Sequence, residues 1–171
     1  MKKLLSITLT TLLVLFASQA FGQTSADVEV SADVLGALTL TPTNVVFGEI
    51  QVDQESTIAA NENDSNNNSN VGASFQVGAL QIEADETDVM VKINQMAVLN
   101  TDQGSEEIQF TPSIYNDNSN LNLEAVDDEA QVTVTNGNIT LDIGGSLPAI
   151  SSPGTYSTEF GEDLIIEVQY L

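Results

Sequence analysis

Apolar and polar residues alternate along much of this 171-residue chain. Between Ala26 and Val34 every second residue is apolar, and the residues between them are Asp, Glu and Ser. The last residues repeat this pattern, with Leu164, Ile166, Val168 and Tyr170 on one face of an extended chain. A period of two is typical of a β-strand with one buried face. Both stretches are therefore predicted to be strands, and the last one is expected to be covered by a second sheet.

Further strands are predicted at 45–50, 56–60, 73–77, 80–82 and 89–93. Pro42 and Asn44 predict a turn before the first of these, and Gly78 predicts a bulge. No stretch has a helical period, and turn signals recur about every ten residues, within the spacing expected of all-β domains. The chain is therefore predicted to be all-β, an antiparallel Ig-like β-sandwich of two sheets with roughly seven to ten short strands.

The clearest local signal is Asn136-Gly137, the preferred pair for a two-residue type I′ turn. Counting outward pairs Val134 with Ile139, Val132 with Leu141, and Ala130 with Ile143, all apolar. Because register and pattern agree, a β-hairpin is predicted over 130–143. The Gly144-Gly145 pair that follows precedes no helix, so it indicates close packing or a bulge rather than a phosphate-binding loop.

Residues 1–22 have the features of a signal peptide. Lys2 and Lys3 are followed by a short apolar run and a small-residue cleavage site before Gln23. The run is too short and too interrupted by Ser and Thr to span a bilayer. We therefore expect a secreted protein, located in the periplasm, on the cell surface or outside the cell, with one β-sandwich domain over 23–171.

Charge and composition restrict the chemistry. The chain has 25 acidic residues, three basic residues, and no His or Cys. Without Lys2 and Lys3, only Lys92 remains against the acids, giving 1 − 25 = −24. Such a field repels nucleic acid and anionic membranes and attracts cations. The missing His and Cys exclude His-assisted nucleophiles, thiol chemistry and disulfides. A non-enzymatic protein without a cofactor is expected.

Three polar loops are candidate cation sites. They are the Asn-rich segments 61–70 and 116–120 and the acidic segment 127–129. Their carboxylates Asp64, Asp117, Asp127 and Asp128 are the hard oxygen ligands that Ca²⁺ prefers. The fit to an EF-hand is poor, because its Gly and its terminal Glu are missing. Solvated loops in a protein adapted to a saline environment are the simpler interpretation.

Several segments together resemble a family of secreted bacterial proteins. They are 46–50 (VFGEI), 75–78 (FQVG), 143–147 (IGGSL), 153–157 (PGTYS) and 167–170 (EVQY). In this order they resemble the family known as domain of unknown function 4402. The resemblance implies an Ig-like sandwich akin to pilin-type and spore-coat-type surface domains, and it brings no catalytic residues.

Two hypotheses for function follow. The first is a structural or surface-interaction protein, a pilin-like or coat-like subunit that pairs β-strands with itself or with other surface subunits. Its candidate assembly residues are Val28, Val30, Val34 and Tyr170, although the simpler interpretation of residues 26–34 is the first strand of the domain itself. Many pilins also have a Cys pair that this chain lacks. The second is a Ca²⁺- or glycan-binding module that uses the Asn/Asp-rich loops.

Overall fold

The computed structural model describes residues 36–61, 67–85, 88–104, 106–116 and 119–171. The chain divides into two units, 1–34 and 35–171, and the described residues all belong to the second. The predicted signal peptide and the predicted strand at 26–34 therefore lie outside the described residues. Twelve strands are formed: β1 (Thr39–Thr43), β2 (Ser56–Ile58), β3 (Gly78–Glu83), β4 (Asp88–Gln95), β5 (Val98–Asn100), β6 (Ile108–Gln109), β7 (Thr111–Asn116), β8 (Ser119–Asn120), β9 (Glu129–Thr133), β10 (Asn138–Leu147), β11 (Ser157–Glu162) and β12 (Ile165–Tyr170).

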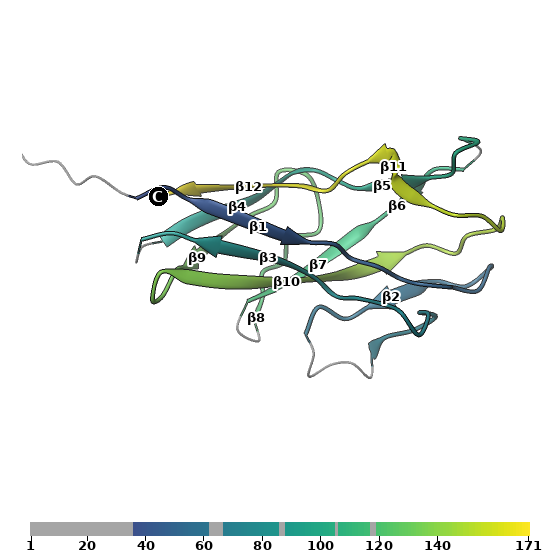
Figure 1. The fold of residues 1–171 in the computed structure, drawn as a ribbon, viewed down its shortest axis with the longest axis horizontal. Helices are drawn as coiled ribbons and strands as arrows, with labels where there is room; N and C mark the ends of the chain where they lie inside the picture. The colour runs from purple at the N-terminus through teal and green to yellow at the C-terminus, as the bar shows by residue number, and fades with distance from the viewer. Residues whose placement is uncertain (1–35, 62–66, 86–87, 105, 117–118) are drawn as a thin grey trace, which may run out of the picture. The chain divides into compact units, whose positions relative to one another are not determined.

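The strands form one large sheet and two shorter ladders (Figure 1). The large sheet has the order β1-β3-β10-β7-β8, with β2 also paired to β10. The ladders have the orders β12-β4-β9 and β11-β5-β6. Every pair of these strands is antiparallel, as the sequence predicted. The strands outnumber the expected seven to ten because β4/β5, β6/β7 and β11/β12 are successive pieces of extended runs, interrupted by one or two residues.

One of these runs crosses between the two layers. The Phe110 N–H donates to the Ala97 carbonyl at 3.0 Å, which extends the pairing between β5 and β6. The next residue, Thr111, already pairs with Ser146 in the large sheet. The two layers are therefore joined along this side by a continuous stretch of chain.

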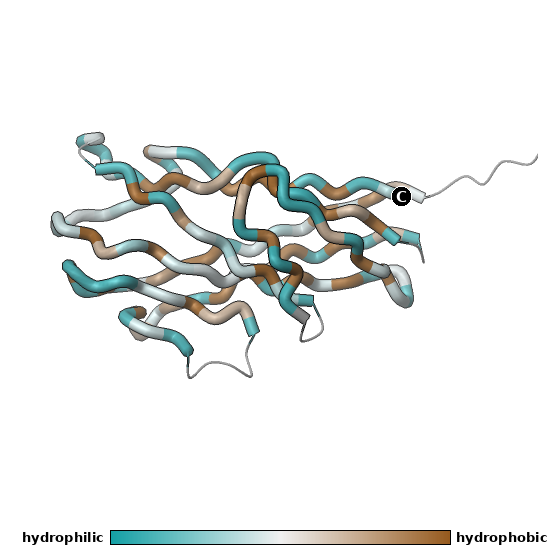
Figure 2. The backbone as a smooth tube through the Cα atoms, turned by 180° about the vertical axis from the view of Figure 1, so that it is seen from behind, coloured by the Kyte–Doolittle hydropathy of each residue, from teal (hydrophilic) through white to brown (hydrophobic). Residues whose placement is uncertain are grey.

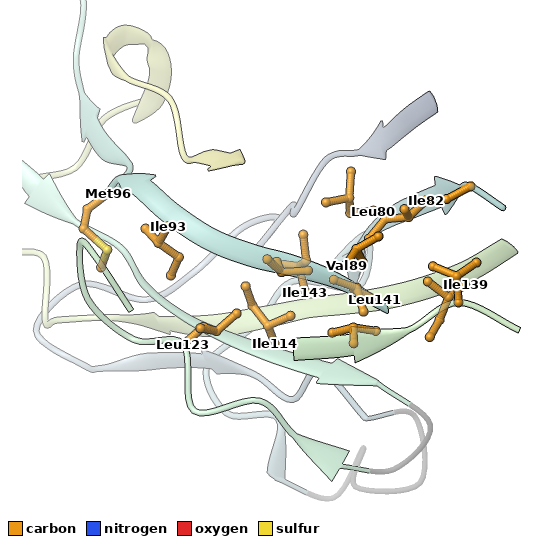
Figure 3. Packing of buried hydrophobic residues seen from close by; sticks show 14 residues of the cluster. Leu80, Ile82, Val89, Ile93, Met96, Ile114, Leu123, Ile139, Leu141 and Ile143 are labelled. Carbon is orange, nitrogen blue, oxygen red and sulfur yellow. The ribbon is translucent and has the colours of Figure 1, made fainter. Parts of the chain in front are cut away.

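The core lies between the large sheet and the β12-β4-β9 ladder. On β4, Val89, Val91 and Ile93 alternate with less buried residues, as their period of two predicted. They pack in one cluster with Ile114 of β7 and Leu141 of β10, both fully buried. Figure 3 shows side chains of this cluster between the strands, and Figure 2 shows the alternation of apolar and polar positions along the backbone. The result is an antiparallel all-β fold of the sandwich type.

The predicted hairpin is wrong in its pairing, although its turn is correct. Asn136 and Gly137 have φ values of 57° and 81°, as a type I′ turn requires. Beyond the single bridge Thr135↔Asn138, however, the flanking strands separate into different layers. Val132 pairs with Val89, and Leu141 pairs with Leu80. The apolar faces predicted to be cross-strand neighbours instead face each other across the core.

The segment 39–50 also differs from its prediction. Pro42 lies inside β1 rather than in a turn, an arrangement that proline tolerates in an edge strand. The predicted strand 45–50 is reduced to one bridge, Val46↔Gln76, and Gly48 has a positive φ of 72°. Residues 73–77 contribute only that bridge, and β3 begins at Gly78. The chain after β1 is therefore irregular, and it leaves one end of the sandwich open.

Gly144 and Gly145 allow close backbone packing, one of the two predicted roles. A Cβ atom on Gly144 would lie 2.3 Å from the Ile58 carbonyl oxygen and 2.5 Å from the Ala60 nitrogen. A Cβ atom on Gly145 would lie 2.3 Å from the Thr111 carbonyl oxygen. Only glycine lets β10 approach the backbones on both of its sides this closely.

A candidate assembly surface

Both layers end on the same side in edge strands. In the described residues β1 pairs only with β3, and β12 pairs only with β4 (Figure 1). All five residues of β1 are exposed. On β12, Ile166, Val168 and Tyr170 share a face with Leu164 and pack against the core, but each is only half-buried. The predicted apolar face is thus present, and the predicted full cover over it is not.

The outward backbone groups of β12 follow from the ladder. Ile93 exchanges backbone hydrogen bonds with residues 127 and 128, so its N–H and C=O point toward β9. Successive residues of a strand point these groups in opposite directions, so the backbone N–H and C=O of Lys92 point toward Glu167 of β12. The bond from the Leu171 N–H to the Asp88 carbonyl fits the same alternation along the two strands. The N–H and C=O groups of Ile166, Val168 and Tyr170 consequently face the open edge.

A groove of about 1220 Å³ lies between the two edges. One wall is formed by Leu40 of β1 and by residues 42–52, which comprise the end of β1 and the irregular segment after it. The other wall comprises 152–158 and 163–166. Its floor is apolar and buried, formed by Leu80, Ala97, Phe110, Ile143, Leu147 and Ile150. Its walls carry four of the large apolar side chains that are exposed in the described residues, namely Leu40, Val46, Val52 and Ile165. Exposed apolar side chains gathered in one place indicate an interaction surface.

The charged groups of the groove are acidic. Glu49 and Asp163 line it, and no Lys or Arg does. Tyr156, also in the lining, donates a hydrogen bond of 2.9 Å to Glu106 on a neighbouring loop. This bond lowers the pKa of Glu106, while desolvation and then Glu106 raise the pKa of Tyr156. The groove therefore suits an apolar, extended segment better than an anionic ligand.

Tyr170 fixes the position where the chain enters the described domain. Its hydroxyl donates to the Gly36 carbonyl at 3.1 Å and accepts from the Asp85 N–H at 3.4 Å. The Asp85 carboxylate in turn accepts from the Gly36 N–H. The other assembly candidates, Val28, Val30 and Val34, lie outside the described residues. Tyr170 is recognisable from the sequence pattern as an assembly candidate, whereas Gly36 and Asp85 are not, because their contact depends on long-range folding.

The cation candidates are not brought together in the part of the chain that the structure describes. Asp127 forms an ion pair with Lys92 at 2.7 Å, and the Asp128 carboxylate accepts from the Glu124 and Ala125 N–H groups at 2.9 and 2.8 Å. Both aspartates therefore stabilise the turn before β9. Asp64 and Asp117 lie outside the described residues. Among the described residues, no group of three or more His, Cys, Asp or Glu could hold a metal ion.

The end of the first Asn-rich loop is more ordered by hydrogen bonds than its composition suggests. Asn70 has a positive φ of 48°, and its side chain bonds to both backbone groups of Gln51 and to the hydroxyl of buried Ser56. The Asn68 side chain accepts from the Ala59 N–H at 2.7 Å. These amides hold β2 and its approach in place, so this part of the loop is structural.

Lys92 lies among carboxylates. In addition to Asp127, it pairs in register with Glu129 on β9 and with Glu167 on β12. The hydrogen bond and charge of Asp127, and then the charges of Glu129 and Glu167, raise the pKa of Lys92. One cation thus offsets the repulsion among acidic side chains on β9, on β12 and in the turn before β9.

In the part of the chain that the structure describes, no helix is long and apolar enough to cross a membrane. No family model matches this chain, and no curated protein matches it.

Proposed function

We propose that this protein is an exported, non-enzymatic structural subunit that assembles with further copies, or with other surface subunits, by β-strand pairing. The observation that supports this most directly is the apolar groove between two edge strands whose backbone groups are open to a partner. A new strand placed there gains main-chain hydrogen bonds from the edge and apolar contacts from the groove.

Each edge strand carries one of the features that limit association. Monomeric β-proteins block exposed edges with Lys, Pro, bulges or covering loops. β1 contains Pro42, and the pairing of β12 with β4 shifts register between Ile165 and Ile166. Beyond that shift β12 contains no Pro or Lys, and the apolar residue Ile165 at its start is 45% exposed. The open edge of β12 is therefore the stronger candidate for strand addition.

The calcium- or glycan-binding alternative has less support. Asp127 and Asp128 are already used by Lys92 and by a turn backbone. The floor of the groove is apolar, and the polar side chains that could recognise a sugar lie in its walls. Family membership in domain of unknown function 4402 remains part of the proposal and rests on the segments quoted above.

Light scattering after size-exclusion chromatography tests the proposal. Protein spanning 23–171 is expected to increase in mass with concentration. Val168→Pro removes an N–H from the open edge of β12 and should abolish this increase. Val168→Ala is the matched control, because it shortens the same side chain but retains the N–H, and it should still assemble.

A monomer at every concentration would overturn the proposal. If calcium stabilised that monomer, the result would favour the cation-binding module instead. Assembly of Val168→Pro equal to that of Val168→Ala would show that contacts other than the β12 edge hold the copies together.

A further inference from the structure

The groove between β1 and β12 has chemistry suited to one more strand. It is apolar at its floor, has acidic groups at its rim, and meets the open edge of β12 at Ile166. An occupant should be extended, with small or medium apolar side chains at alternate positions. Its other face should remain polar, since that face would lie in solvent.

One segment of this chain has that pattern. Residues 26–34 place three Val and two Ala on one face and Asp27, Glu29, Ser31 and Asp33 on the other. As a strand, these nine residues would extend about 30 Å at roughly 3.3 Å per residue. The apolar face of this segment requires an apolar surface to pack against, and the exposed apolar side chains of the groove would be covered by such a strand.

The way in which the chain enters β1 favours a groove on another copy. Gly36 is fixed by Tyr170 and Asp85 at the end of β12, whereas the groove lies at its start, around Leu164–Ile166. To reach the groove of its own domain, the chain would have to reverse direction before β1. Residues 36–38 form no turn, and Gly36 does not have a positive φ.

The residues preceding Gly36 lack the residue types that best form a tight two-residue reversal. Residues 23–35 contain no Gly, Asn or Pro, and Ser and Asp are the only turn-favouring residues among them. Resting on the proposed function, we infer that residues 26–34 of one copy insert into the groove between β1 and β12 of a second copy. Each copy both supplies a segment and accepts one, so the contact is head-to-tail and extends into a chain of subunits.

Charge makes this contact dependent on salt. The segment carries three carboxylates, and the accepting groove carries Glu49 and Asp163 within a strongly acidic chain. Screening lengths fall from about 10 Å at 0.1 M salt to about 3 Å at 1 M. Assembly should therefore strengthen as salt is added, and sodium chloride at matched ionic strength should reproduce the effect of calcium.

Two variants test the contact from its two sides in the 23–171 protein. Val30→Asp places a charge on the apolar face of the segment, and Ser31→Asp is its matched control on the polar face. Ile165→Glu places a charge on the groove wall, and Val126→Glu is its control, because Val126 is similarly exposed, at 48% against 45%, and does not line the groove. Val30→Asp and Ile165→Glu should each shift the assembly midpoint at least about tenfold to higher concentration, because each buries an unpaired charge. Both controls should assemble like the unmodified protein.

Mixing the two disruptive variants gives the decisive measurement. Val30→Asp retains a functional groove, and Ile165→Glu retains a functional segment, so an equimolar mixture should form 1:1 dimers. These dimers should not grow, because the only remaining segment is charged and the only remaining groove is blocked. Light scattering distinguishes such dimers from monomers and from longer chains.

The other outcomes separate this inference from the proposed function. If the unmodified protein assembles and Val30→Asp assembles equally well, the inference is wrong while the proposed function stands. If the unmodified protein is monomeric and Val30→Asp lowers its stability, the segment occupies the groove of its own chain. That result, or a mixture that remains monomeric, would also overturn the inference.

Discussion

The glycine pair of β10 leads to a prediction about stability that can be worked from distances. In Gly144→Ala the new Cβ would lie 2.3 Å from the Ile58 carbonyl oxygen and 2.8 Å from the Ala59 carbonyl carbon. Ordinary contacts begin near 3.4 Å, so the strands must separate by about 1 Å. The obstacle is backbone, and β10 is held by β3, β2 and β7, so little relaxation is available.

Overpacking of this kind typically costs about 1–3 kcal/mol. Loss of glycine entropy from the unfolded chain offsets about 0.4–1 kcal/mol of that cost. Because the obstacle is backbone, the cost should lie near the upper end of its range, which leaves a net destabilisation of about 2–2.6 kcal/mol, or about 2–4 °C in Tm for each kcal/mol. Because the chain has no Trp, urea denaturation is best followed by circular dichroism.

Gly154→Ala is the matched control. Its Cβ would meet only side-chain atoms, Thr101 Cγ2 at 3.3 Å and Tyr156 Cε2 at 3.5 Å, and Gly154 has no positive φ. This variant should be as stable as the unmodified protein or slightly more stable. A Gly144→Ala protein with unchanged stability would refute the close approach of β10 to residues 58–60.

Three further predictions concern the core and the charged contacts. Leu141→Ala, at a fully buried position, should lower the free energy of unfolding by about 2–5 kcal/mol in urea denaturation, and a loss below 1 kcal/mol would contradict the described core. The lowered pKa of Glu106 means that its bond to Tyr156 stabilises the fold above the ordinary value of 4.5 and is lost as pH falls through the lower folded pKa. Tyr156→Phe should therefore lower Tm near neutral pH and have less effect in acid, and an equal effect at both would count against the bond. Lys92→Gln should destabilise the protein most at low salt, because salt screens the attraction to Asp127, Glu129 and Glu167; a loss of stability unaffected by salt would show that the charge is not responsible.

The sequence predicts local structure in this protein better than it predicts pairing. The period of two at Val89, Val91 and Ile93 identifies β4. The Asn136-Gly137 pair identifies the turn, because these two residue types adopt the positive φ that a type I′ turn requires. These signals depend only on neighbouring residues. Whether β9 and β10 pair with each other depends on distant strands, and here β9 pairs with β4 while β10 pairs with β3.

The same limit applies to the candidate site. The half-buried face of β12 was predictable from Ile166, Val168 and Tyr170, and the open edge beside it was not. The groove depends on where the irregular segment after β1 and the loop before β11 lie, and no periodicity encodes this. Asp127 and Asp128 show the same limit. Composition indicated that they could bind a cation, but in the fold Asp127 pairs with Lys92 and Asp128 accepts hydrogen bonds within a turn.

The position of β10 near the end of the chain has a consequence for when folding can occur. β2, β3 and β7 all precede Asn138, and each depends on β10 as a partner in the large sheet. During synthesis, a chain that ends before residue 138 lacks the strand that joins them, so the large sheet cannot form. Completion of the β12-β4-β9 ladder is delayed further, because its last strand, β12, ends at Tyr170. A protein exported as proposed would thus remain unfolded, and able to pass through a narrow translocation channel, until nearly all of it had been made.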